Sequence, residues 1–178
     1  DRAVGGAGVG LESVSLLALW LETVAIDAPL AFLDHHLQPG DSLIGARIDR
    51  LDSLPGRALI TGVFREQIDA ALPSLLEPLE EIRALPSSTL ADVKRKEQIF
   101  KRRFRTAEQR FQKVADVWCA AAVGALREVS TPSDYAGVVR TLSERRRNGH
   151  DHPLVEAGRV HLEKLKITPF HWQLVFPE

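Results

Sequence analysis

Hydrophobic residues in the second half of the chain recur at intervals of four and three. The two intervals alternate strictly from residue 100 to residue 125, which is the seven-residue repeat of a helix with one apolar face. The residues of this seam are Phe100, Phe104, Ala107, Phe111, Val114, Trp118, Ala121 and Ala125. We therefore predict one long helix that begins after Pro86, with Ser87 or Ser88 as its N-cap, and runs unbroken to about Val129.

An antiparallel partner for this helix is predicted just before it. Residues 61–85 carry apolar side chains at helical spacing, and Pro73 and Pro78 should kink that segment or split it into shorter helices. Two more helices are predicted at 135–147, where Pro132 suits the first turn, and at 154–165. The middle of the chain, about 60–166, is thus expected to be a helical hairpin or bundle.

The two ends of the chain show a different pattern. Residues 30–33 and 42–44 are short apolar runs, and Phe170–Phe176 has the composition of a strand. Residues 11–26 have the pattern of a buried, apolar helix. A helical excursion between two strands of one sheet fits this order. The predicted fold class is mainly α, with divisions at 1–58, 59–167 and 168–178.

Composition narrows the class of protein only slightly. The 178 residues, 44% of them hydrophobic, are enough for one domain with a core. The formal charge is −1, from 23 basic and 24 acidic residues, so only the distribution of charge can indicate a partner. No apolar run approaches the ~18 residues of a membrane span. The chain contains no Met, which indicates a processed chain or a piece of something longer.

Positive charge is concentrated on the predicted long helix. Between residues 94 and 113 there are nine basic residues and two acids, Glu97 and Glu108, so the net charge is 9 − 2 = +7. We predict that these side chains point away from the seam and contact DNA phosphates. The alternative is a solvated helix face, and Arg145–Arg147 could extend the patch. The nine residues are Lys94, Arg95, Lys96, Lys101, Arg102, Arg103, Arg105, Arg110 and Lys113.

Other reactive residues give weaker signals. His35 and His36 are adjacent, and His150 and His152 lack the Cys/His spacing of a zinc site, so we expect them to cap turns or pack, and we predict no metal. Cys119, the single cysteine, is expected to be a buried, unreactive thiol, which suits a reducing cytoplasm. No catalytic residue is predicted.

Two separated stretches resemble one family. The first contains Leu17–Thr23 (LALWLET), Pro29–Leu37 (PLAFLDHHL) and Gly40–Gly45 (GDSLIG), and the second is Pro169–Glu178 (PFHWQLVFPE). Both are similar to the large adenine-specific DNA methyltransferases of fused, type IIG-like restriction–modification enzymes, whose relatives serve phage-defence systems such as BREX and DISARM. The resemblance covers both edges of the chain and leaves 60–166 unmatched.

The resemblance implies a middle segment of such an enzyme, with the helical region inserted in a partial Rossmann-like α/β sheet. Its parent would be a cytoplasmic, prokaryotic enzyme that flips an adenine from double-stranded DNA and methylates N6 from S-adenosylmethionine. This chain lacks the earlier cofactor loop and the Asn-Pro-Pro-aromatic motif, so by itself it should be inactive and depend on the remainder of the polypeptide. Asp41 is expected to accept a hydrogen bond from the cofactor's adenine amine, or to be a turn residue.

A second interpretation stays open. The chain could be a non-catalytic helical module that binds another macromolecule. Its heptad seam would then pair with another chain and not with residues 61–85.

Overall fold

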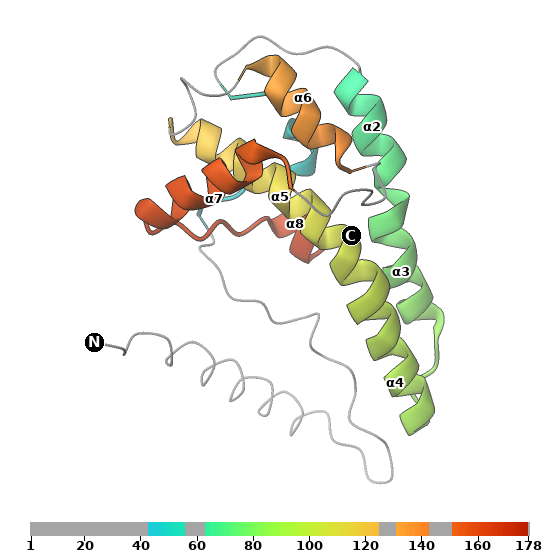
Figure 1. The fold of residues 1–178 in the computed structure, drawn as a ribbon. Coiled ribbons are helices and arrows are strands. Elements are labelled where there is room, and N and C mark those ends of the chain that lie inside the picture. The colour runs from blue at the N-terminus through green and yellow to red at the C-terminus, as the bar shows by residue number, and fades with distance from the viewer. Residues whose placement is uncertain (1–42, 56–62, 125–130, 143–150, 178) are drawn as a thin grey trace, which may run out of the picture.

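Helices dominate the part of the chain that a computed structural model describes, which is residues 43–55, 63–124, 131–142 and 151–177 (Figure 1). No β-strand forms in these ranges, so the prediction of a mainly α protein is confirmed for them. The elements are the 3₁₀ turn η1 (Ile48–Arg50), α2 (Val63–Ala71), α3 (Pro73–Ala84), α4 (Leu90–Ile99), the π-helical turn η2 (Phe100–Phe104), α5 (Arg105–Ala122), α6 (Pro132–Arg140), α7 (Pro153–Lys164) and α8 (Trp172–Val175).

The predicted long helix exists as α4, η2 and α5, which run end to end, but both of its predicted ends were wrong. Its N-cap is Thr89, because Thr89 Oγ1 accepts from the Asp92 amide at 3.2 Å while Asp92 Oδ2 accepts from the Thr89 amide at 2.9 Å. The helix ends at Ala122, not near Val129. Gly124 stops it with φ +84°, a left-handed conformation that glycine adopts without strain.

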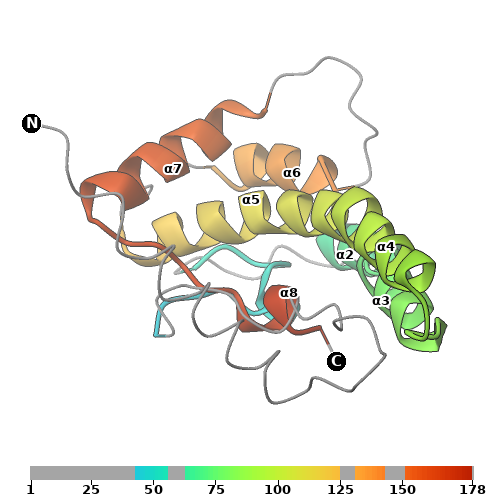
Figure 2. The ribbon, with the colours of Figure 1, turned by 90° about the horizontal axis from the view of Figure 1, so that it is seen from below.

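The antiparallel partner is where the sequence placed it. Pro73 splits residues 61–85 into α2 and α3, and α3 runs back along α4 and η2 (Figure 2). The seam faces the inside of the protein, since Phe104, Phe111 and Val114 are each 2% exposed or less. Within the described residues the seam therefore packs against the same chain, α3 included, and its pairing with another chain stays an untested hypothesis.

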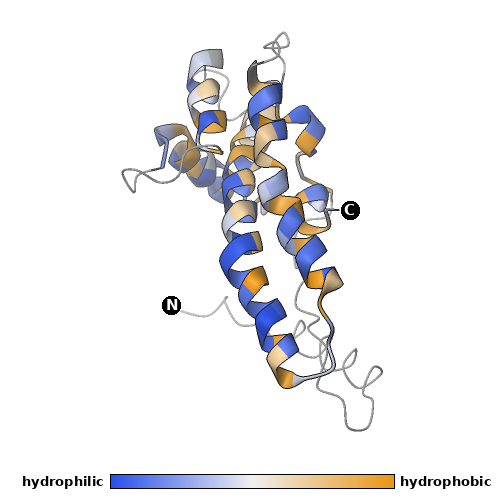
Figure 3. Ribbon diagram, turned by 90° about the vertical axis from the view of Figure 1, so that its right-hand side faces the viewer, coloured by the Kyte–Doolittle hydropathy of each residue, from blue (hydrophilic) through white to orange (hydrophobic). Residues whose placement is uncertain are grey.

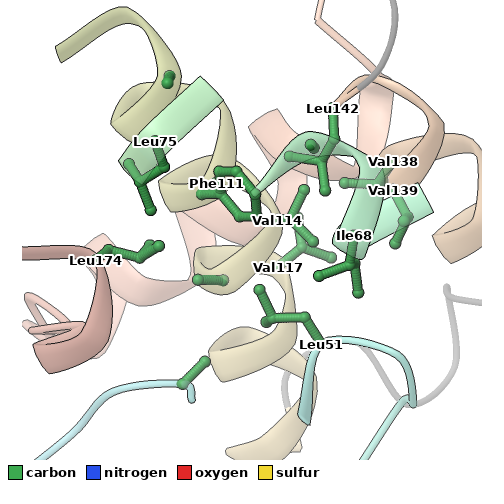
Figure 4. Packing of buried hydrophobic residues seen from close by; sticks show 14 of the residues in the cluster. Leu51, Ile68, Leu75, Phe111, Val114, Val117, Val138, Val139, Leu142 and Leu174 are labelled. Atoms are coloured by element: carbon green, nitrogen blue, oxygen red, sulfur yellow. The ribbon is translucent and has the colours of Figure 1, made fainter. Parts of the chain in front are cut away.

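The core lies where α5 meets α2, α3, α6, α7 and α8. Figure 4 shows Ile68, Leu75 and Val138 pointing at the side chains of α5. The loop before α2 is joined to this core by Tyr135 and by Trp118, whose Nε1 donates to the Ser53 carbonyl at 2.8 Å. Tyr135 is fully buried and donates its hydroxyl to the Leu51 carbonyl at 2.8 Å, and burial raises the pKa of Tyr135.

The shorter helices form where they were expected, but α6 (Pro132–Arg140) begins three residues before the predicted 135–147 and ends earlier, and residues 143–147 lie outside the described ranges. Thr131 and Asp134 form the capping box of α6, and Pro132 occupies its first turn as predicted. Helix α7 spans Pro153–Lys164, within one residue of the predicted 154–165. No helix in the described ranges is long and apolar enough to cross a membrane.

The predicted strand at Phe170–Phe176 does not form, and none forms at 42–44 within its described residues. The amides of Leu174, Val175 and Phe176 bond to carbonyls three or four residues earlier, which closes the short helix α8. These local bonds prevail over the aromatic and β-branched composition, which favours a strand only where a neighbouring strand pairs with it. The predictions for residues 11–26 and 30–33 lie outside the described residues.

Candidate nucleic-acid interface

All nine predicted DNA-binding residues lie on α4, η2 and α5, but five of them already have partners. Their bonds join the long helix to itself, to α3 and to the residues beside α7. Lys96 donates to Ser87 Oγ at 2.7 Å, Lys101 pairs with Glu97, Arg103 with Glu81, Arg105 with Glu108 at 2.8 Å, and Lys113 with Asp151 at 2.6 Å. Arg105 also lies over the Phe100 ring, 5.0 Å from its centroid.

The remaining four are Lys94, Arg95, Arg102 and Arg110, which we call the unpaired cations. Among the described residues their side chains make no ion pair or hydrogen bond. Lys94, Arg95 and Arg102 are exposed and Arg110 is half-buried. Figure 3 shows the hydrophilic outer face of the long helix beside α3. This face is the part of the helix that can meet a phosphate without breaking an existing contact.

Ion pairs with acidic residues elsewhere in the chain also reduce the net positive charge around residues 94–113. Two of the paired carboxylates, Glu81 and Asp151, come from outside residues 94–113, so the local balance is +7 − 2 = +5. Exposed ion pairs of this kind typically contribute only ~0–1 kcal/mol, so they fix side chains more than they stabilise the fold. The predicted nine contacts are therefore reduced to four uncommitted ones. Arg145–Arg147 lies outside the described residues.

A second set of polar contacts joins the two edges of the chain. We call residues 44–48 together with 169–174 the junction. The Phe170 amide donates to the Ile44 carbonyl at 2.7 Å, and the Ile48 amide donates to Gln173 Oε1 at 2.7 Å. A β-carbon added at Gly45 would lie 2.1 Å from the Phe170 carbonyl oxygen, so only glycine fits there.

His171 ties the junction to α5. It is 3% exposed, and its Nδ1 accepts from the Ala46 amide at 3.0 Å. Because that ring nitrogen accepts, the ring proton is on Nε2, which donates to Asp116 Oδ1 at 3.0 Å. The sequence analysis missed both His171 and Asp116. The two residues are 55 positions apart, and neither the PFHWQLVFPE stretch that contains His171 nor the helical spacing around Asp116 indicates their contact.

A cleft of about 190 Å³ lies between α5 and α8. Its polar lining comes from Arg105, Glu108, Gln112 and His171. Glu108 is 6% exposed, and burial raises the pKa of its carboxyl group although Arg105 beside it acts in the opposite direction. His171 uses both ring nitrogens for protein contacts, so we assign the cleft no acid–base role.

Two of the remaining candidate residues, His152 and Cys119, have structural roles. His152 caps α7 by accepting from the Leu154 amide at 3.3 Å, as expected of a loop histidine. Cys119 is 2% exposed, and burial, helped by Asp116, raises its pKa to about 12, so the buried thiol is confirmed. The described residues contain no group of three or more side chains that could hold a metal. His35, His36, Asp41 and His150 lie outside the described residues.

Comparisons with protein-family models, with curated proteins and with solved structures find no match to this chain.

Proposed function

We propose that this chain contacts the backbone of double-stranded DNA through the unpaired cations, as a segment of an adenine-specific DNA methyltransferase. The observation that carries the proposal is the division of the nine basic residues into five that have partners and four that have none among the described residues. Neutralising phosphates with Lys and Arg releases counterions and gives affinity that is independent of sequence and sensitive to salt. Lys94, Arg95, Arg102 and Arg110 are available for this without rearrangement.

The methyltransferase part of the proposal is supported by the junction. The two stretches that carry the family resemblance include Gly45 and Pro169–Glu178, and these stretches approach each other at Ile44, Ala46 and Phe170. A helical region inserted in a host domain needs its entry and exit points side by side. The Rossmann-like sheet would come from the rest of the polypeptide together with residues 1–42.

Cofactor binding depends on that rest of the polypeptide. Of the residues that the resemblance assigns to S-adenosylmethionine, only Asp41 is in this chain. The cleft beside α8, at about 190 Å³, is below the ~300 Å³ at which sites for ligands of this size begin. A larger groove of about 450 Å³ lies between η1, α2, α3 and the C-terminal segment, and its polar lining is Asp49, Gln173 and the pair of Arg65 and Asp69, 3.2 Å apart. Neither contains a residue that the resemblance assigns to the cofactor, so the proposal gives the described residues the role of holding DNA.

Fluorescence anisotropy with a labelled 20-base-pair duplex tests DNA contact. The wild-type chain should bind with a dissociation constant in the range of ~10⁻⁴–10⁻⁶ M that is typical of non-specific contacts, and more weakly as salt rises. The combined variant Lys94→Gln, Arg95→Gln, Arg102→Gln and Arg110→Gln should lose most of this binding, because all four substitutions remove cations that have no partner within the described part of the chain.

A matched control removes the same charge elsewhere. Arg50, Arg83, Lys164 and Lys166 are also exposed, and the variant with all four changed to Gln should bind DNA within about twofold of wild type. Equal losses in the two variants would mean that net charge alone matters. Absence of binding by wild type at low salt would overturn the proposal.

A separate experiment tests the methyltransferase assignment in the intact parent enzyme. Asp41→Ala should weaken S-adenosylmethionine binding by about tenfold in calorimetry, the loss of one hydrogen bond to a charged group. Ser42→Ala next to it serves as the control. Unchanged cofactor affinity in Asp41→Ala would exclude that role for Asp41 and leave the DNA contact unaffected.

A further inference from the structure

We infer that the π-helical turn η2 lines up the unpaired cations in one narrow row that fits the backbone of a DNA duplex and not a single strand. The inference rests on the proposed function, because it specifies the form of nucleic acid that the same surface binds. Its starting point is the bond from the Arg105 amide to the Phe100 carbonyl, five residues back, which replaces the usual bond four residues back.

This bond changes the register of the helix. An α-helix turns by about 100° per residue, and one π turn adds a residue, so every later position is turned back by about 100°. Counted from Lys94, Arg95 lies at about 100°. Arg102 lies in the middle of the π turn and is turned back by only about half of this rotation, from about 80° to about 30°. Arg110 lies at about 60°, whereas a straight α-helix would put it at about 160°. The π turn thus gathers all four cations into an arc of about 100°.

The positions between the cations agree with this row. By the same count Gln98 lies at about 40° and Thr106 at about 20°, and both are exposed. The buried residues Ala107 and Phe111 lie at about 120° and 160°, outside the arc. From residue 94 to residue 110 the row is slightly shorter than the ~24 Å of sixteen α-helical steps of about 1.5 Å, because the π turn rises less per residue, which leaves roughly 22 Å. One DNA strand presents a phosphate every ~3.4 Å, so the row covers about six base pairs.

The chemistry of the row favours a duplex. Proteins that bind single strands combine cations with aromatic side chains on which the bases stack. Gln98 and Thr106, which lie between the cations, have no such ring. The row is also bounded on one side by acidic residues, since Arg103 at about 108° pairs with Glu81 of α3, and Glu77 and Glu80 of that helix are exposed. A row of four cations with only uncharged side chains between them and an acidic border on one side suits the phosphates of one edge of a duplex.

A pair of substitutions tests the row directly. Gln98→Arg adds a cation inside the row, while Gln112→Arg adds the same charge to the same helix at about 260°, on the other flank. Both positions are exposed and Arg favours helices, so both variants should fold as wild type does by circular dichroism. Binding to a 20-base-pair duplex and to one of its strands is measured by anisotropy between 25 and about 200 mM salt, the range in which counterion release is read.

The wild-type chain should bind the duplex more tightly than the strand, with a slope of log affinity against log salt near −3.6, which is about −0.9 for each of four contacts. Gln98→Arg should steepen the slope by about 0.9 and tighten duplex binding about tenfold at 50 mM salt. Gln112→Arg should leave both within experimental error.

Three results would overturn the inference while leaving DNA contact intact. These are equal gains from the two Arg variants, tighter binding to the single strand, and a wild-type slope near −8, which would mean that all nine cations take part. Absence of wild-type binding to either form of DNA would instead overturn the proposed function itself.

Discussion

The helical hairpin formed by α3, α4, η2 and α5 and the junction are built on different principles. The hairpin is held by a repeat of apolar side chains, each of which contributes ~1.5–3 kcal/mol when fully buried. The junction is held by single hydrogen bonds between residues far apart in the chain, such as Ala46 to His171 over 125 positions. Each such bond adds only ~0.5–1.5 kcal/mol, but an unmade one leaves a buried polar group that costs ~1–3 kcal/mol.

The two regions should therefore differ in how well they tolerate substitutions. A hairpin of repeated contacts loses stability in proportion to the volume removed, and its geometry survives most substitutions. The junction has few contacts and no redundancy, so a small change should break its geometry.

Phe111→Ala should cause the largest loss of stability. Phe111 is 1% exposed at the centre of the seam, and truncating a buried Phe typically costs ~3–5 kcal/mol through lost transfer energy and a cavity. Urea unfolding followed by far-UV circular dichroism measures the change. Leu90→Ala on the same helix is the control, since Leu90 is 61% exposed and should lose less than ~0.5 kcal/mol. Similar losses at the two sites would argue against a seam-centred core.

Gly45→Ala should be the most damaging change in the junction. The added β-carbon would lie 2.1 Å from the backbone oxygen of Phe170, which cannot move without breaking the bond from the Phe170 amide to Ile44. We expect a loss of about 2–3 kcal/mol. Hydrogen exchange should show faster exchange of the Ala46 and Phe170 amides than in wild type.

Gly158→Ala is the matched control for that change. A β-carbon at Gly158 of α7 would lie 3.5 Å from Val117, an ordinary contact, and Ala is the better helix former by ~1 kcal/mol. This variant should be as stable as wild type or slightly more stable. A loss at Gly158 equal to that at Gly45 would remove the contrast between the two regions.

The sequence predicted the hairpin well because periodicity records local burial. Phe104, Phe111 and Val114 were assigned to one face by spacing alone, and all are buried. Helix ends were less accurate, since Ser87, Ser88 and Thr89 are all good caps and only the bond to Asp92 decides among them.

The junction and the ion pairs could not be predicted in this way. Arg103 looked as uncommitted as Arg102 until α3 placed Glu81 beside it. The contact of His171 with Asp116 likewise depends on how α8 lies against α5, which no local pattern encodes. Because local sequence does not show how elements pack, a strand was also expected at Phe170–Phe176, where composition was the only signal.

His171→Ala should destabilise the protein by about 2 kcal/mol, because it leaves the Ala46 amide and Asp116 without their partner. His171→Asn offers an informative comparison, since its side-chain oxygen can take the place of Nδ1 as acceptor from Ala46 and recover part of the loss. Thermal unfolding measures both variants. If His171→Ala were as stable as wild type, the ring would merely fill space at the junction.

The smallest change in stability is expected at the residue that ends a helix in each region. The hairpin's α5 ends on Gly124 at φ +84°, while α7, which leads into the junction, ends on Lys166 at φ +56°. The Ile167 amide donates to the Leu162 carbonyl at 2.9 Å, so the left-handed residue closes α7 in the same manner as a glycine would.

A left-handed conformation costs a residue with a β-carbon ~1–2 kcal/mol. Gly124→Ala should therefore destabilise the protein by about 1 kcal/mol, and Lys166→Gly should stabilise it by a similar amount. Chemical unfolding of the two single variants measures these opposite shifts; a stabilising Gly124→Ala would show that the hairpin does not need its left-handed stop.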